Sequence, residues 1–200
     1  MRIIAGIYRS RTLEAPEGLS TRPTSDRLRE TLFNILAPRI EGAHFLDLYA
    51  GSGAVALEAL SRRAAHVELV EKAPSALKVL RGNFARLGVK SGYQIYESSV
   101  VAALKKILQR NAKNNGGAFD LIFLDPPYDA AEEYSATLES LGGPLSALLA
   151  TDGMLIAEHR RKVKLAESYG LLTRTRLREQ GDAALSFYGF RVVPPDESAG

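Results

Sequence analysis

The chain has 200 residues and a mass of 21.7 kDa, which is the size of one domain with at most a small appendage. Its hydrophobic content of 46% and charged content of 24% exclude a disordered chain. It has no cysteine, which excludes disulfides, thiolate metal sites and cysteine nucleophiles, and its three histidines lack the spacing of a metal site. No apolar run reaches the length of a membrane span and no signal peptide opens the sequence. We therefore expect a soluble, cytoplasmic protein without a membrane partner.

Positive charge is unevenly distributed, although the net charge is only +3. It gathers in residues 1–12, 101–113 and 160–178, and the first two of these stretches contain no acidic residue. A polyanionic partner requires such clusters, although each one alone is also typical of a solvated surface. Three clusters together favour a nucleic acid.

The first 40 residues predict an extension that precedes the main domain. Residues 2–8 and 11–13 alternate in the manner of strands and predict an N-terminal β-hairpin. A helix follows from about residue 26, with apolar side chains at helical spacing until Pro38 ends the run. We expect this extension over 1–40, the main domain over 41–193, and a tail without fixed structure over 194–200.

From residue 44 onward, short apolar strands alternate with amphipathic helices. This order predicts an α/β fold with a doubly wound, mostly parallel sheet. A final antiparallel hairpin is expected, with Arg174, Arg176 and Arg178 on one face of its first arm. The expected strands are 45–48, 67–70, 93–96, 119–124, 154–157, 171–178 and 185–193, and the expected helices are 54–62, 77–87 and 101–109.

A glycine pair joins the first strand of this domain to its helix. Gly51 and Gly53 permit a sharp turn and a close approach of the backbone to a ligand. With Ala56 they also match the dinucleotide-binding fingerprint, and a tight turn that only packs helix on strand remains an alternative. The loop alone therefore does not identify its ligand.

Two acidic residues favour one ligand over the others. Asp47 ends the first strand, where its carboxylate would repel a pyrophosphate and attract the ammonium of a methionine moiety. Glu71 ends the second strand, where a carboxylate can accept both hydroxyls of an adenosine ribose. An amino acid attached to a nucleoside describes S-adenosylmethionine better than NAD.

The tetrapeptide Asp125-Pro126-Pro127-Tyr128 follows the expected central strand. An exocyclic amine of a base is a poor nucleophile. Asp125 and the Pro126 carbonyl could accept hydrogen bonds from the two N–H groups of such an amine and so aim the lone pair of its nitrogen at a methyl group. The prolines make this edge rigid and remove donors, and Tyr128 could stack on a base taken out of its helix. At this position a plain surface turn is the weaker interpretation.

Together these motifs resemble an S-adenosylmethionine-dependent amino-methyltransferase with a Rossmann-like fold. The stretches Met1-Arg2-Ile3-Ile4-Ala5-Gly6 and Arg22-Pro23-Thr24-Ser25-Asp26-Arg27-Leu28-Arg29-Glu30-Thr31-Leu32-Phe33-Asn34 narrow the resemblance to the RsmD family, bacterial enzymes that methylate guanine N2 in 16S ribosomal RNA. The resemblance implies a seven-stranded sheet with an antiparallel last strand. It also implies that the N-terminal hairpin helps to hold the ribosomal substrate.

The resemblance, read with the motifs, gives a set of expected site residues and partners. Where relatives often carry Asn or Asp against the adenine, this chain has Glu97-Ser98-Ser99, so the resemblance does not identify the residue that contacts the adenine, and Ser99 enters the cofactor set from this segment. We expect a monomer that acts on ribosomal RNA within an assembled or assembling small subunit. The catalytic set is Asp125, Pro126, Pro127 and Tyr128; the cofactor set is Asp47, Ala50, Gly51, Ser52, Gly53, Glu71 and Ser99; the substrate set is Arg2, Arg9, Arg11, Arg22 and Arg27; no metal is expected.

Other functions remain open at the level of sequence. A DNA adenine-N6 methyltransferase also uses Asp-Pro-Pro-Tyr, but such enzymes usually carry a recognition domain, and only 72 residues follow Tyr128 here. A glutamine methyltransferase would more typically have Asn at position 125. An NAD-dependent oxidoreductase would leave Asp47 and Asp125 without a role. A catalytically inactive RNA-binding scaffold would have no need of both motifs.

Overall fold

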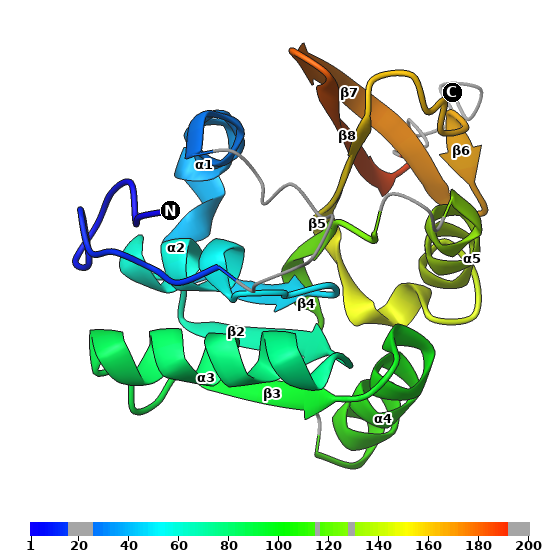
Figure 1. Cartoon of the computed structure of the whole chain (residues 1–200). Helices are drawn as coiled ribbons and strands as arrows, with labels where there is room; N and C mark the ends of the chain where they lie inside the picture. Colours follow the sequence, from blue (N-terminus) through cyan, green and yellow to red (C-terminus); the bar gives the residue numbers. More distant parts are fainter. Residues whose placement is uncertain (16–25, 115–116, 128–130, 192–200) are drawn as a thin grey trace, which may run out of the picture.

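The computed structural model describes residues 1–15, 26–114, 117–127 and 131–191, and within these residues it contains one eight-stranded sheet in the order β3-β2-β1-β4-β5-β8-β7-β6 (Figure 1). Strands β1 to β5 run parallel, whereas β6, β7 and β8 pair antiparallel. This confirms the predicted doubly wound, mostly parallel fold, with one short strand more than the resemblance implies. The strands are β1 His44–Asp47, β2 His66–Glu71, β3 Tyr93–Glu97, β4 Phe119–Leu124, β5 Leu149–Arg160, β6 Ser168–Tyr169, β7 Leu172–Gln180 and β8 Ala183–Phe190.

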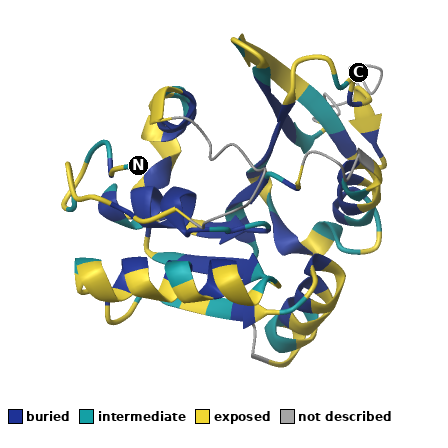
Figure 2. Cartoon of the chain, viewed as in Figure 1, coloured by how far each residue is buried: buried dark blue, intermediate teal, exposed yellow. Residues whose placement is uncertain are grey.

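Helices cover both faces of the sheet and divide the core into two clusters. On one face lie α1 (Asp26–Ile40), α2 (Ala54–Ser61) and α3 (Pro74–Leu87), which pack around Phe45 and Phe123. On the other face lie α4 (Val100–Asn114) and α5 (Ala131–Leu141), and the short helix η1 (Ser146–Leu148) leads into β5. Figure 2 shows buried residues concentrated where these layers meet. No helix of the described chain is both long and apolar enough to cross a bilayer.

The strand order reverses between β1 and β4, and this reversal positions the site. The two strands pair in parallel with Asp47 opposite Phe123, so both end at the same edge of the sheet. In open α/β sheets the chain diverges at such a reversal and leaves a crevice beyond the carboxyl ends of the strands. Asp47 and Asp125 therefore meet the same crevice.

The N-terminal segment forms an antiparallel loop rather than a regular two-stranded ladder. Its arms meet at a single bridge between Arg2 and Thr12, with flanking backbone bonds from Ile3 to Arg11 and from Leu13 to Met1, both at 3.0 Å. A side chain of α2 accepts hydrogen bonds from further N–H groups of the segment. The Glu58 carboxylate accepts hydrogen bonds from the N–H groups of Ile4 and Ala5, at 2.7 and 3.1 Å. These bonds to α2 replace the longer strand pairing that the alternation predicted.

Element boundaries differ from the predicted ones where tertiary packing outweighs local signals. Helix α1 continues through Pro38 to Ile40. A proline in the last turn removes only one backbone hydrogen bond, and Ile40 is buried in the core because the helix continues. Helix α5, which begins at Ala131, was not predicted. Strand β5 is also longer than the predicted 154–157, because it pairs with β4 on one side and β8 on the other.

The expectation that three arginines of β7 share one face is wrong. A register shift lies between Arg174, which pairs with Tyr188, and Arg176, which pairs with Phe187. Because Tyr188 and Phe187 are neighbours on β8, their side chains point to opposite faces of the sheet. The bulge therefore places Arg174 on the face of α4 and α5, and Arg176 and Arg178 on the face of α1.

Candidate active site

A cavity of about 390 Å³ opens at the carboxyl edge where the strand order reverses. It is lined by residues that follow β1, β2, β3 and β4 and by the first turns of α4 and α5. Of the predicted catalytic and cofactor residues, the lining includes Asp47, Ala50, Gly51, Ser52, Glu71, Ser99, Asp125, Pro126 and Pro127. Gly53 lies just behind it, at the start of α2, and Tyr128 is outside the described residues.

The glycine loop after β1 is fixed by its own backbone and by a side chain of α3. Gly51 and Gly53 adopt positive φ angles of 52° and 77°, which other residues adopt at a cost. A Cβ at Gly53 would lie 3.1 Å from the Phe84 ring, so this position also needs a small residue for packing. The Asn83 amide donates to the Ser52 carbonyl at 2.9 Å and holds the middle of the loop. The loop is thus rigid before any ligand binds.

Asp47 is the most unusual group in the cavity. It is 1% exposed, and within the described structure neither of its carboxylate oxygens has a hydrogen-bond partner. Burial raises the pKa of Asp47 to about 7, with a smaller contribution from the negative charge of Glu71, while the backbone N–H dipoles of Tyr49 and Ala56 oppose the rise without reaching hydrogen-bond geometry. An unpaired carboxylate at the cavity wall fits a cationic ligand group, and the ammonium of S-adenosylmethionine is such a group.

Glu71 faces the cavity but also binds the backbone on both of its sides. One carboxylate oxygen accepts the N–H of Gly51 at 2.9 Å, and the other accepts the N–H groups of Lys72 and Ala73, both at 2.8 Å. A carboxylate offers about four acceptor positions, so three are used within the protein. Glu71 therefore ties the glycine loop to the start of α3, and one acceptor position remains for a ligand hydroxyl.

Ser99 combines a place in the cavity with a structural role. Its carbonyl accepts the N–H of Ala103 at 3.0 Å and its hydroxyl accepts that of Ala102 at 3.4 Å, so it caps α4. Beside it the cavity wall is apolar, and Val101 is 59% exposed. Sequence reasoning missed Val70, Lys72, Ala73, Ser98, Val100 and Val101, although their positions at or just after the ends of β2 and β3 could have pointed to them.

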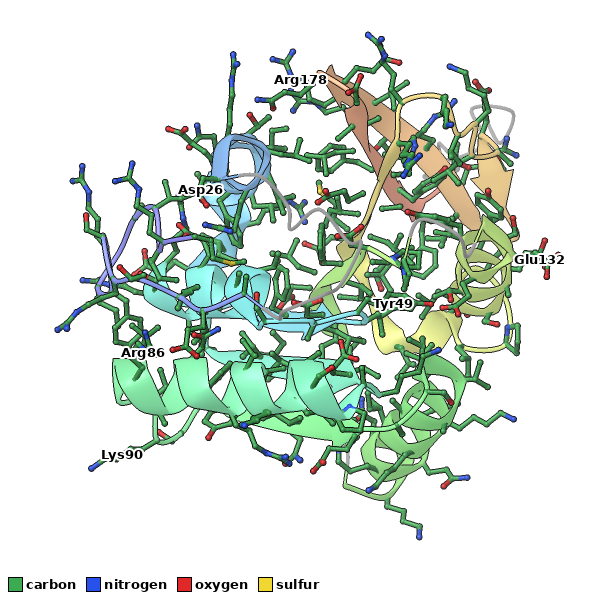
Figure 3. All side chains as sticks on the ribbon, in the orientation of Figure 1. Asp26, Tyr49, Arg86, Lys90, Glu132 and Arg178 are labelled. Carbon is green, nitrogen blue, oxygen red and sulfur yellow. The ribbon has the colours of Figure 1, made fainter. Side chains whose placement is uncertain are left out.

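A second unpredicted group comes from α5. Glu133, Ala136 and Thr137 line the cavity together with Tyr49, which Figure 3 marks near the edge of the sheet that faces α5. The Tyr49 hydroxyl lies 3.5 Å from the Thr137 hydroxyl, and burial raises the pKa of Tyr49. The Glu133 carboxylate lies 3.8 Å from the Lys72 ammonium, which brings α5 close to the end of β2.

The Asp-Pro-Pro segment forms a wall of the same cavity. Asp125 is half-buried, Pro126 is buried and Pro127 is exposed. Neither proline has a backbone N–H, so this wall presents carbonyl and carboxylate oxygens to its surroundings. Such a wall can accept the hydrogens of an amine, while the Asp47 side of the cavity can hold a cation.

The predicted substrate arginines are not part of the cavity. Arg2, Arg9 and Arg11 are exposed on the N-terminal segment, and Arg27 is exposed at the start of α1. Arg22 lies outside the described residues. In the part of the chain that the structure describes, any contact of these side chains with a substrate must therefore be made beyond the cavity.

Comparison with known proteins identifies the family of this chain. The family model described as "Conserved hypothetical protein 95" matches residues 1–189. The chain is 36% identical over 188 residues to "Putative rRNA methyltransferase YlbH" of Bacillus subtilis, which covers 94% of this chain and 98% of that protein. It is 41% identical over 128 residues to "Ribosomal RNA small subunit methyltransferase D" of Escherichia coli, which covers 64% of this chain and 60% of that one.

A solved structure extends this similarity to the whole fold. The structure titled "Putative methyltransferase yhhF from Escherichia coli" matches with a TM-score of 0.76 and 34% identity, over 95% of this chain and 97% of that chain. The two sequence relatives and this structural neighbour are all named as methyltransferases. The chain belongs to the RsmD family of methyltransferases.

Proposed function

We propose that this protein transfers a methyl group from S-adenosylmethionine to the exocyclic N2 of a guanine in small-subunit ribosomal RNA. One observation carries the proposal: Asp125, Pro126 and Pro127 line the same cavity as Asp47 and the glycine loop. A methyl donor held on one side would thereby face an amine held on the other. Relatives named as ribosomal RNA methyltransferases support RNA as the substrate.

Each group has a role that follows from its chemistry. Bound S-adenosylmethionine supplies an electrophilic methyl group. Asp47 holds the ammonium end of the cofactor, Gly51 and Ser52 let its chain approach the backbone, and Glu71 and Ser99 face its nucleoside half. Asp125 and the carbonyl of Pro126 accept hydrogen bonds from the two N–H groups of the guanine amine, so that the lone pair of the amine nitrogen points at the methyl group.

Replacing Asp125 tests this assignment. We expect Asp125→Ala to reduce methyl transfer about 10- to 150-fold, the equivalent of one hydrogen bond to a charged group at about 1.5–3 kcal/mol, while cofactor affinity changes less than about twofold. Asp125→Asn should retain part of the activity, because an amide oxygen still accepts one bond. Single-turnover rates and calorimetry measure the two quantities, and a normal rate in Asp125→Ala would contradict the role.

Nucleoside analysis tests the substrate. Radiolabelled S-adenosylmethionine is offered with small-subunit particles, protein-free 16S RNA and DNA, and each product is digested to nucleosides. We expect N2-methylguanosine, with particles methylated faster than free RNA, because a small domain has little surface with which to select one guanine. N6-methyladenine in DNA without transfer to ribosomal material would instead identify a DNA adenine methyltransferase.

A further inference from the structure

The exposed basic side chains of the C-terminal hairpin are not used by the cavity. The bulge in β7 separates its arginines into two environments, one on each face of the sheet. Arg174 is engaged within the protein: it donates to the Leu165 carbonyl at 3.2 Å and to the Glu167 carboxylate at 3.3 Å. Arg176 and Arg178, on the face of α1, are exposed, and among the described residues neither has a carboxylate within ion-pair distance.

The bulge itself is well defined. Its extra residue is Thr175, whose hydroxyl donates to the Phe187 carbonyl at 3.3 Å. The guanidinium carbon of Arg176 lies 5.9 Å from the centre of the Phe187 ring, and Arg176 is exposed. Arg178 lies two residues further on, near the free end of the hairpin (Figure 3). Arg160, opposite Ala183, adds a third exposed basic residue on this face.

The register of the sheet relates this surface to the active site. Leu124 pairs with Ala157, so Asp125 comes level with Glu158, the next residue of β5. Glu158 pairs with Leu185, and Leu185 pairs with Arg178. Arg178 therefore lies level with Asp125 but three strands away, about 14 Å at the usual strand spacing. A polynucleotide whose base enters the cavity can extend across this distance within a few nucleotides.

We propose that Arg176 and Arg178, the hairpin arginine pair, bind phosphates of the RNA that flanks the target guanine. The inference rests on the proposed function. Guanidinium groups bind phosphate through paired N–H bonds, and exposed arginines without carboxylate partners have these donors available. Arg161 and Lys162, exposed in the loop that joins the end of β5 to β6, extend the positive surface beyond the hairpin end, because the N–H of Arg161 bonds the Asp182 carbonyl at 2.8 Å.

The salt dependence of RNA binding tests the proposal with the full chain. Affinity for protein-free 16S RNA is measured between 50 and 300 mM KCl, concentrations over which each phosphate contact adds about 0.7–0.9 to the slope of log K against log salt. We expect Arg176→Gln/Arg178→Gln to lower the slope by about 1.4–1.8, and Arg176→Lys/Arg178→Lys to keep most of it. Cofactor affinity, measured by calorimetry, should stay within about twofold of wild type in both variants.

Two control variants separate this surface from general charge effects. Arg174→Gln removes an arginine of the same strand on the opposite face, and Lys78→Gln/Lys90→Gln removes two exposed charges, on α3 and just after it, that lie outside the three basic stretches. Both should keep the wild-type slope, and Arg174→Gln should lower the melting temperature because Arg174 holds Leu165 and Glu167. If the hairpin variant kept the slope of the Lys78/Lys90 variant, the hairpin assignment would be wrong. If wild type itself bound no ribosomal RNA, the proposed function would fail with it.

Discussion

At the scale of single residues, Asp47 connects the stability of the protein with its ligand. The pKa of this buried carboxyl is about 7, against an ordinary value of 3.8, so the folded protein retains a proton that the unfolded chain loses. The contribution of Asp47 to the free energy of unfolding is therefore most favourable below pH 3.8. It falls by about 4 kcal/mol as the pH rises to about 7, which is the cost of a buried carboxylate. A cation beside the carboxylate offsets that cost.

The pH dependence of cofactor binding follows from this shift. Below pH 7 the binding of S-adenosylmethionine should release up to about one proton, because the ammonium favours the ionised form of Asp47. We expect affinity to rise between pH 6 and 8, and calorimetry in buffers of different ionisation enthalpy to detect the released proton. Asp47→Asn should bind more weakly, without proton release and with a flat pH profile; a wild-type profile in this variant would contradict the assignment.

The same substitution should have the opposite effect on the cofactor-free protein. An amide at position 47 carries no charge at any pH, so Asp47→Asn avoids the cost of a buried carboxylate. We expect it to raise the melting temperature at pH 8 and to do so much less at pH 4, where the wild-type carboxyl is protonated in the folded state. Differential scanning fluorimetry without cofactor at the two pH values measures the difference.

At the scale of elements, the N-terminal segment depends on a buried ionic cluster. Glu58 accepts two backbone N–H groups of the segment and also contacts Arg62 at 2.8 Å and Arg29 at 3.9 Å. The Arg29 side chain is fully buried, and its guanidinium donates to the Arg2 carbonyl and the Asp26 carboxylate. The segment is thus attached through Glu58 and Arg29, whose side chains are both fully buried.

Removing Glu58 should release the segment. We expect Glu58→Ala to destabilise the protein by about 3–5 kcal/mol, because it removes the fully buried carboxylate beside the buried Arg29 and leaves the N–H groups of Ile4 and Ala5 without their acceptor. Hydrogen exchange should lose protection at Ile4 and Ala5 while the strands of the sheet stay protected. Glu41→Ala is the control: it breaks the exposed pair with Arg63 and should cost at most about 1 kcal/mol.

Sequence reasoning succeeded for elements in which the local pattern and the tertiary packing agree. The alternation of strands and helices and the loops after β1 and β4 were visible in the chain. The bulge at Thr175 was not, because only pairing with β8 decides which face each arginine takes. The bonds of Glu71 to backbone N–H groups likewise could not be read from its position at a strand end.

At the scale of the whole molecule, the predicted boundary at residue 41 does not separate two cores. Leu32, Phe33 and Leu36 of α1 are buried in the same cluster as Phe45 and Phe187 of the sheet. We therefore predict that residues 41–193 do not fold on their own, because removal of 1–40 would expose a large apolar face. Expression of 41–193 beside the full chain, compared by near-ultraviolet circular dichroism, tests this; a folded truncated protein would contradict it.

Helix α2 has a consequence for the mutational tolerance of this chain. It is only eight residues long, follows the glycine loop at one end and holds the N-terminal segment at the other, and all of its residues except Leu60 are buried. Selection should remove amino-acid substitutions in α2 almost as readily as substitutions at Asp47 or Asp125. In a saturation screen α2 would therefore appear as a block of intolerant positions, most of which touch no ligand. Sensitivity to substitution cannot by itself map the active site of this enzyme.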